Sequence, residues 1–210
     1  MIEFKDVSYG YPKSGVPVLR NFSAEFFPAE ITAITGPNGC GKTTVTKLIA
    51  GILRPLNGTI LIDGEDVADL DLFDIGRRAG NVFQDPSRQL FCSTVSEEVK
   101  FGLKNIGLTE DEAEETAGRY LDMFGIRHLS QRFPGKLSQG EKQRVALAAV
   151  LSMGTNYVIL DEPTTGLDVR SRRKLGEYLT EIRNSGRGVI IVSHERQFCE
   201  KYTDRELRMK

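Results

Sequence analysis

A glycine-rich segment early in the chain ends in a lysine followed by two threonines. Its spacing, G-x-x-x-x-G-K-T, lets backbone N–H groups converge on phosphate oxygens, while the lysine neutralises the terminal phosphates and the first threonine ligates Mg²⁺. The sequence therefore predicts that ATP or GTP binds here together with Mg²⁺. The residues of this predicted phosphate loop are Gly36, Pro37, Asn38, Gly39, Cys40, Gly41, Lys42, Thr43 and Thr44.

A buried strand and an amphipathic helix are expected on either side of the phosphate loop. Residues 31–35 form a short apolar run, and apolar residues recur at the spacing of one helix face from Val45 to Leu53, with Gly51 near the helix end. The N-terminus of such a helix adds partial positive charge beside bound phosphates. Strand, loop and helix in this order favour phosphate binding over a glycine turn that binds nothing.

Two adjacent carboxylates follow a second apolar run, residues 157–160. Residues one apart on an extended chain point in different directions, so Asp161 and Glu162 can take different roles. We predict that Asp161 holds Mg²⁺, directly or through water, and that Glu162 orients and polarises the attacking water. A pair of solvated acids at a strand end is the alternative, but a phosphate loop requires an acid of this kind.

The length and composition of the chain exclude several classes of protein. Its 210 residues suffice for one large α/β domain with an inserted subdomain, but not for two independent domains of ordinary size. The net charge of −1 lacks the basic excess of a typical nucleic-acid binder, and the three cysteines lack metal-ligand spacing and fit a reducing cytosol. No apolar run approaches the length that crosses a bilayer.

Further residues stand in an order typical of one protein family. Residues 137–144 read Leu-Ser-Gln-Gly-Glu-Lys-Gln-Arg and precede the acidic pair, while Gln84, residues 167–168, His194 and Tyr11 lie around them. This set resembles the ATP-binding-cassette (ABC) ATPases over essentially the whole chain. In that resemblance the segment 137–144 is the signature, Gln84 the Q-loop glutamine, residues 167–168 the D-loop and His194 the switch histidine.

The resemblance implies a role for each site residue. The catalytic residues would be Glu162, His194, Lys42 and Gln84, and the Mg²⁺ ligands would be Thr43, Gln84 and Asp161. Ser138 and Gly140 would reach the γ-phosphate of ATP bound by the other subunit of a dimer. Tyr11 would stack on the adenine base, with Tyr9 as the alternative because it lies on the same face of an extended segment.

The signature differs from the usual Leu-Ser-Gly-Gly-Gln at Gln139 and Glu141. The run from Ser138 to Glu141 fits a capping box, in which the serine caps a helix and the glutamate accepts the backbone N–H of the serine. A carboxylate near the polyphosphate should also repel it modestly. Whether these two differences slow turnover stays open.

The implied fold class is α/β, a P-loop NTPase with a RecA-like, mostly parallel core, an antiparallel β-subdomain and an inserted α-helical subdomain. The chain would be a single ABC ATPase domain, residues 1–210, with the nucleotide-binding core and β-layer in 1–85 and 157–210 and the helical signature subdomain in 86–156. Short alternating runs before residue 27 and at 58–64 predict the antiparallel layer. A second capping box, Thr109 with Glu112, predicts a helix that Gly125 ends.

Residues 82–103 resemble the corresponding segment of the energy-coupling-factor (ECF) transporter ATPases, which serve cobalt, nickel and vitamin importers. In ABC importers this region grips a coupling helix of the membrane subunit, so we expect an integral membrane partner near Gln84–Phe91. The alternative is that the apolar residues Leu90, Phe91 and Val95 only pack the inserted helices.

The resemblance thus implies an ATP-hydrolysing subunit that powers solute transport through a membrane partner, in ECF-type uptake of a vitamin or transition-metal ion. We expect a peripheral protein on the cytoplasmic face of the cell membrane, active as a homodimer or as a heterodimer with a related ATPase, with ATP and Mg²⁺ and without nucleic acid. The alternative is a soluble ABC ATPase that acts as an ATP-driven clamp on DNA or ribosomes. The transported solute stays open because the membrane components select it.

Overall fold

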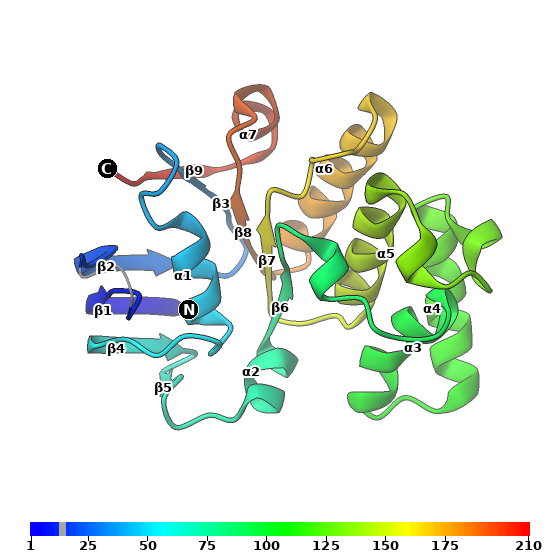
Figure 1. Cartoon of the computed structure of the whole chain (residues 1–210), viewed down its shortest axis with the longest axis horizontal. Coiled ribbons are helices and arrows are strands. Elements are labelled where there is room, and N and C mark those ends of the chain that lie inside the picture. The colour runs from blue at the N-terminus through cyan, green and yellow to red at the C-terminus, as the bar shows by residue number, and fades with distance from the viewer. Residues whose placement is uncertain (13–15) are drawn as a thin grey trace.

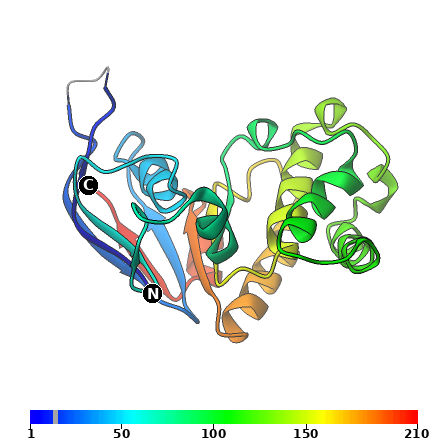
Figure 2. The same ribbon diagram turned by 90° about the horizontal axis from the view of Figure 1, so that it is seen from below.

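The computed structural model describes residues 1–12 and 16–210, in which two β-sheets and a group of helices follow one another along the longest axis (Figures 1 and 2). The antiparallel sheet has the order β2-β1-β4-β5 and consists of β1 (Ile2–Tyr9), β2 (Leu19–Phe26), β4 (Asn57–Ile62) and β5 (Glu65–Asp66). The parallel sheet has the order β6-β7-β8-β3-β9 and consists of β3 (Ile31–Thr35), β6 (Ala79–Val82), β7 (Tyr157–Asp161), β8 (Gly188–Val192) and β9 (Arg205–Arg208).

Most of the helices between β6 and β7 gather at one end of the molecule, away from β1, β2 and β4 (Figure 1). The α-helices are α1 (Lys42–Ile49), α2 (Leu72–Arg78), α3 (Val95–Asn105), α4 (Glu110–Met123), α5 (Gln139–Ser152), α6 (Val169–Asn184) and α7 (Arg196–Tyr202). Three short 3₁₀ helices are η1 (Pro86–Arg88), η2 (Arg127–Leu129) and η3 (Pro134–Lys136). The predicted α/β class, with a parallel core, an antiparallel layer and a helical segment, is confirmed. Within the described residues, no helix is both long and apolar enough to span a membrane.

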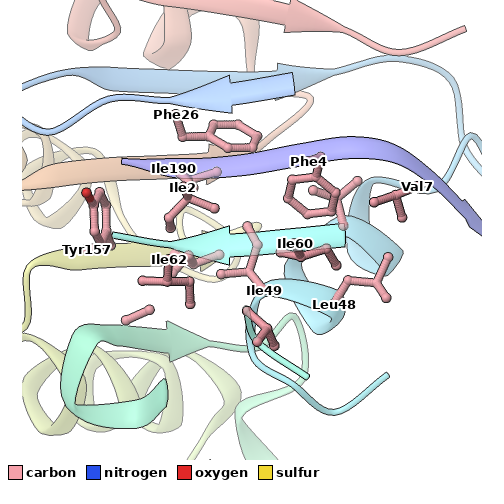
Figure 3. Close-up of a cluster of buried hydrophobic side chains, with 14 of the residues drawn as sticks. Ile2, Phe4, Val7, Phe26, Leu48, Ile49, Ile60, Ile62, Tyr157 and Ile190 are labelled. Atoms are coloured by element: carbon pink, nitrogen blue, oxygen red, sulfur yellow. The ribbon is translucent and has the colours of Figure 1, made fainter. Parts of the chain in front are cut away.

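One apolar core joins the antiparallel sheet to α1 and to the parallel sheet (Figure 3). Ile2 and Ile60 come from the antiparallel sheet, Leu48 from α1 and Tyr157 from the parallel sheet, and each is at most 2% exposed. Burial of one large apolar side chain stabilises the fold by about 1.5–3 kcal/mol. The Tyr157 hydroxyl donates to the Asp63 carboxylate at 2.8 Å, so the buried ring keeps a polar partner. This core holds α1, and therefore the phosphate loop before it, in a constant position.

Helix α5 is buried on two sides. Its residues Leu147 and Leu151 pack against the parallel sheet and α6, whereas Val145 and Ala148 pack against α3 and α4. A helix that is apolar on more than one face is typical of a position between two layers. The helix that carries the signature therefore connects the helical end of the molecule to the parallel sheet.

The helix after the phosphate loop ends near Gly51, as predicted, but its buried face does not extend to Ile52. It ends at Ile49, because Gly51 takes a left-handed conformation with φ 69° that leads the chain out of the helix. Ile52, which the apolar spacing assigned to the buried face, is instead 51% exposed. By contrast, the two predicted capping boxes are present at the starts of α4 and α5.

Candidate active site

The phosphate loop connects β3 to α1 and requires glycine for steric reasons. Gly36 has φ 144°, and a Cβ there would lie 2.6 Å from the carbonyl oxygen of Met209. Gly41, the N-cap of α1, has φ 101°. Lys42 Nζ donates to the carbonyl oxygens of Gly36 and Pro37, each at 2.9 Å. The loop thus places an ammonium group beside the start of a helix, where a phosphate can exchange for these carbonyls.

A cavity of about 380 Å³ opens between the phosphate loop and the ends of β7 and β8. It is lined by Tyr11, Val18, Asn38, Gly39, Gly41, Lys42, Thr43, Thr44, Gln84, Asp161, Glu162 and Val192. Residues from separate sequence motifs therefore meet at one place. Gly36, Pro37 and His194 line a neighbouring cavity of about 770 Å³, and Cys40 Sγ lies 4.0 Å from Lys42 Nζ.

The two candidate aromatic residues differ in their surroundings. Tyr9 is 7% exposed and belongs to the apolar core, whereas Tyr11 is 37% exposed and lines the cavity, with its hydroxyl 3.3 Å from Thr44 Oγ1. The two rings pack edge to face, with their centroids 5.1 Å apart. Val18 adds an apolar surface to the same cavity. Sequence reasoning missed Val18 because it belongs to no motif. It lies beside the phosphate loop because the segment before β2 packs against Gly41.

Asp161, the last residue of β7, is 2% exposed, and neither of its carboxylate oxygens has a hydrogen-bond partner among the described residues. Burial raises the pKa of this carboxyl, and Glu162 raises it further, while Thr43 and the charges of two nearby lysines oppose the shift. A buried carboxylate without a partner is unfavourable in the absence of a cation. The residues present therefore fit Mg²⁺, with Asp161 facing the same cavity as Thr43 and Gln84.

Glu162 turns away from its neighbour through an unusual backbone conformation. Its φ is 52°, in the left-handed region, and its N–H donates to the carbonyl oxygen of Val192 at 2.8 Å. The expectation of two carboxylates alternating along an extended chain was wrong in this respect, because the strand ends at Asp161. Nδ1 of His194 donates to Oε1 of Glu162 at 2.9 Å, while Oε2 is buried without a partner in the described part of the chain. One carboxylate oxygen is thus held and the other can accept a proton.

The backbone around Gln84 is held by a second glutamine. Gln89 Nε2 donates to the carbonyl oxygen of Asn81 at 2.8 Å, and its Oε1 accepts the N–H of Phe83 at 3.3 Å. Asp85 caps η1 by accepting the N–H of Ser87 at 3.1 Å. These bonds place Gln84, two residues after the end of β6, at the edge of the phosphate cavity.

The signature residues do not line the cavity of their own chain. Ser138 caps α5, and both its N–H and its hydroxyl donate to Glu141 Oε2, at 2.8 and 2.7 Å. These bonds from Ser138 hold the pKa of the Glu141 carboxyl below its usual range. A Cβ on Gly140 would lie 2.5 Å from the carbonyl oxygen of Gly166, so glycine is required where α5 meets the loop after Glu162.

Comparisons with known proteins agree with this arrangement. The family described as ABC transporter matches residues 19–165. The energy-coupling factor transporter ATP-binding protein EcfA of Methanothermobacter thermautotrophicus is 42% identical over 207 residues, which cover 98% of this chain and 66% of that protein.

Two solved structures are similar along the whole chain. The first, cbiO1 from Clostridium perfringens, described as part of the ABC transporter complex cbiONQ, is 35% identical, has a TM-score of 0.81, and matches 100% of this chain and 84% of its own. The second, the ATP-binding cassette MJ0796 in a dimeric post-hydrolysis state bound to ADP and Pi, is 26% identical, has a TM-score of 0.91, and matches 100% of this chain and 94% of its own.

These matches cover the phosphate loop, the acidic pair and the signature together. The chain binds ATP and hydrolyses it. It belongs to the ABC transporter family and is an ATP-binding, ATP-hydrolysing subunit of that family.

Proposed function

We propose that this chain is the ATPase subunit of an ECF-type importer that takes up a vitamin or a transition-metal ion. It works at the cytoplasmic face of the cell membrane, attached to an integral membrane subunit. The names of EcfA and of the cbiONQ complex support an ECF-type partner. The observation that carries the proposal is a pair of exposed aromatic side chains next to the Gln84 loop.

Phe91 is 65% exposed and Phe101 is 46% exposed, and the rings pack edge to face with centroids 4.9 Å apart. Neighbouring apolar residues behave differently, since Val95 is fully buried and Leu90 is partly buried against the helices. Core packing therefore accounts for Leu90 and Val95 but not for the aromatic pair. Exposed aromatic residues beside one another are typical of a surface that binds another protein.

The backbone beneath this pair is firmly held. Glu98 is 5% exposed, and its Oε2 accepts the N–H groups of Phe91 at 2.9 Å and Cys92 at 2.7 Å. Hydrogen bonds to a charged acceptor are stronger than those between neutral groups. A partner helix that presses on Phe91 would thus act on a segment held in place between Gln84 and α3.

The proposed hydrolysis depends on groups around the phosphate cavity. Lys42 and the loop N–H groups would stabilise the charge of the phosphates. Asp161, Thr43 and Gln84 would hold Mg²⁺, which would supply further charge neutralisation. Oε2 of Glu162 would accept a proton from the attacking water as the water oxygen bonds to the γ-phosphorus and the bond to the leaving ADP oxygen breaks. His194, which donates to Oε1 of Glu162, would contact the γ-phosphate.

The Mg²⁺ site depends on the nucleotide. No group of three or more His, Cys, Asp or Glu side chains within residues 1–12 and 16–210 is arranged to hold a metal ion. Besides the protein side chains, the ligands of Mg²⁺ would be phosphate oxygens and water, as is usual for this ion. We propose that Ser138 and Gly140 complete the site from a second subunit, either another copy of this chain or a related ATPase.

The partner proposal is tested by purification from detergent-solubilised membranes of the source cells. Wild type is compared with Phe91→Asp and with the control Phe133→Asp, whose residue is 52% exposed in the loop before α5. We expect a polytopic membrane protein to accompany wild type and the control and to be lost with Phe91→Asp. Recovery of ribosomes or DNA instead would support the clamp alternative and contradict the transport function.

A further inference from the structure

Arg172, in the first turn of α6, forms hydrogen bonds to two loops that are far apart in the sequence. Its Nε donates to the carbonyl oxygen of Leu167 at 2.9 Å, and its Nη1 donates to Oε1 of Glu195 at 2.6 Å. Leu167 lies in the loop that follows Glu162, and Glu195 directly follows His194. One guanidinium therefore connects the loops that carry the two members of the Glu162–His194 pair.

Both ends of this connection are held by further bonds. Leu167 is 4% exposed within the apolar core, and the next residue, Asp168, caps α6 by accepting the N–H of Ser171 at 2.8 Å. On the other side, the N–H of Glu195 donates to Ser193 Oγ at 3.0 Å. Hydrogen bonds thus connect the loop containing Leu167 to the backbone on both sides of His194.

The geometry favours arginine over lysine. A guanidinium is a rigid planar fork that can donate to a carbonyl and a carboxylate at the same time, whereas a lysine ammonium on a flexible stem holds no such fixed direction. The side chains of Arg172 and Glu195 are 40% and 28% exposed, and partly exposed ion pairs contribute little to overall stability. Their arrangement is therefore better explained by positioning than by stabilisation.

The same loop also contacts the signature helix. Gly140, in the first turn of α5, lies so close to Gly166 that no side chain fits between them. A displacement of the start of α5 therefore acts on Gly166 and its neighbour Leu167. From there the contacts continue through Arg172 to Glu195 and the catalytic histidine.

We propose that Arg172 is a positioning residue that sets the Glu162–His194 pair according to the position of the signature helix. When Ser138 and Gly140 of one subunit contact the nucleotide bound by the second subunit, the Glu162–His194 pair of the first subunit would be aligned. That pair acts on the nucleotide bound by the first subunit. The inference rests on the proposed function of Glu162 and His194. Arg172 itself lines neither cavity next to the phosphate loop, so it acts through Glu195.

The kinetic test compares Arg172→Met, Arg172→Lys and Glu195→Gln in the full chain with the control Arg173→Met. Arg173 is the next residue on the same helix and pairs with Glu177 at 2.7 Å on the exposed surface. We expect kcat to fall about tenfold in Arg172→Met and less in Arg172→Lys, with KM for ATP changed by less than about twofold, and no effect in the control. The kcat of the double variant Arg172→Met with Glu195→Gln should be no lower than that of the more affected single variant, because both substitutions remove the same interaction.

A spectroscopic test uses the fact that the chain contains two histidines, His128 and His194. The ring resonance of His194 in NMR spectra should move in Arg172→Met and Glu195→Gln, while that of His128 stays in place. Wild-type kcat with an unmoved His194 resonance would overturn the inference, as would an equal kinetic loss in Arg173→Met. If Arg172→Met does not fold, Arg172→Lys and Glu195→Gln decide the question by the same two measurements.

The two hypotheses can fail separately. A wild-type chain without ATPase activity would contradict the assigned function, whereas the NMR comparison needs no hydrolysis and still tests the link from Arg172 to His194. If Glu162→Gln abolishes turnover while both Arg172 variants turn over normally, the function stands and the positioning role is wrong.

Discussion

Glu162 combines a strained backbone with an incompletely paired carboxylate. A left-handed φ in a non-glycine residue costs about 1–3 kcal/mol and persists only where surrounding contacts impose it. Here the bond from its N–H to Val192 imposes it, and the result is that Oε1 meets His194 while Oε2 stays buried and unpartnered. Such an oxygen, next to a phosphate loop, is suited to accept a proton from water.

The first prediction concerns Glu162→Gln. We expect ATP binding to be retained, because Lys42 and Thr43 are unchanged, and hydrolysis to fall by a factor of about 100 or more, because an amide does not accept the proton. Nucleotide binding and steady-state ATPase rates measure the two effects. Glu177→Gln, an exposed change on α6 next to Arg173, is the control. Normal turnover in Glu162→Gln would rule out its role as the base.

Helix α5 depends on its capping box for its first turn and on two apolar cores for its position. The bonds donated by Ser138 lower the pKa of Glu141. Because the folded pKa lies below that of an ordinary glutamate, about 4.3, the stabilisation is fully present above that value and is lost as the pH falls through the lowered pKa.

We propose that residues 86–156 form a helical subdomain, with α5 as its connection to the parallel sheet.

The second prediction follows from this linkage. Glu141→Ala should lower the melting temperature at neutral pH, and the difference from wild type should shrink as the pH falls through the lowered pKa, because the protonated side chain loses most of its value as an acceptor. Melting curves from neutral pH to about pH 3 measure this difference. A difference that stays constant over this range would show that the carboxylate charge does not contribute to the cap.

The third prediction concerns charge at the start of the same helix. Glu141→Gln should lower the melting temperature less than Glu141→Ala does, since glutamine also serves in a capping box but lacks the carboxylate charge. ATP-dependent dimerisation should strengthen or stay level, and more so at low salt, because exposed charges are screened at high salt. Glu112→Gln, in the matching box of α4, is the control. A glutamine variant that dimerises less readily and melts much earlier would contradict the repulsion between Glu141 and phosphate.

Within one chain, the phosphate cavity and the signature are separate, since Ser138 and Gly140 do not line the cavity that holds Lys42 and Asp161. We propose that a second subunit completes the site. The similar cassette MJ0796 was solved as a dimer, which supports this arrangement. We propose that bound ATP connects the two subunits. Formation of the dimer would therefore depend on nucleotide.

The fourth prediction tests this closure. Glu162→Gln should elute as a dimer with ATP and largely as a monomer without it, or should dimerise only when a related ATPase is added. Adding Ser138→Arg should abolish the dimer by placing bulk at the phosphate contact, whereas adding Thr109→Arg, at the N-cap of α4, should not. Light scattering after gel filtration measures the mass. An oligomer that forms without ATP and tolerates Ser138→Arg would count against the shared site.

Features that depend on neighbouring residues could be predicted from the amino-acid sequence. The phosphate loop, the acidic pair at the end of β7 and the caps at Thr109 and Ser138 are set by glycine, hydroxyl and carboxylate residues at short spacing, because hydrogen bonds and steric limits within a few residues determine them. The fold class was predicted from the resemblance to the ABC ATPases that these motifs carry. The end of α1 near Gly51 was predicted as well, although the apolar spacing wrongly placed Ile52 on the buried face.

Other features depend on contacts between distant segments. Tyr9 and Tyr11 share one alternation, and only the packing of β1 separates the buried ring from the one at the cavity. The turn at Glu162 is imposed by β8, and Arg172 bridges loops that no sequence spacing relates. Each of these arrangements arises when burial of apolar side chains brings remote backbone groups together, and burial acts on the whole chain rather than on its local pattern.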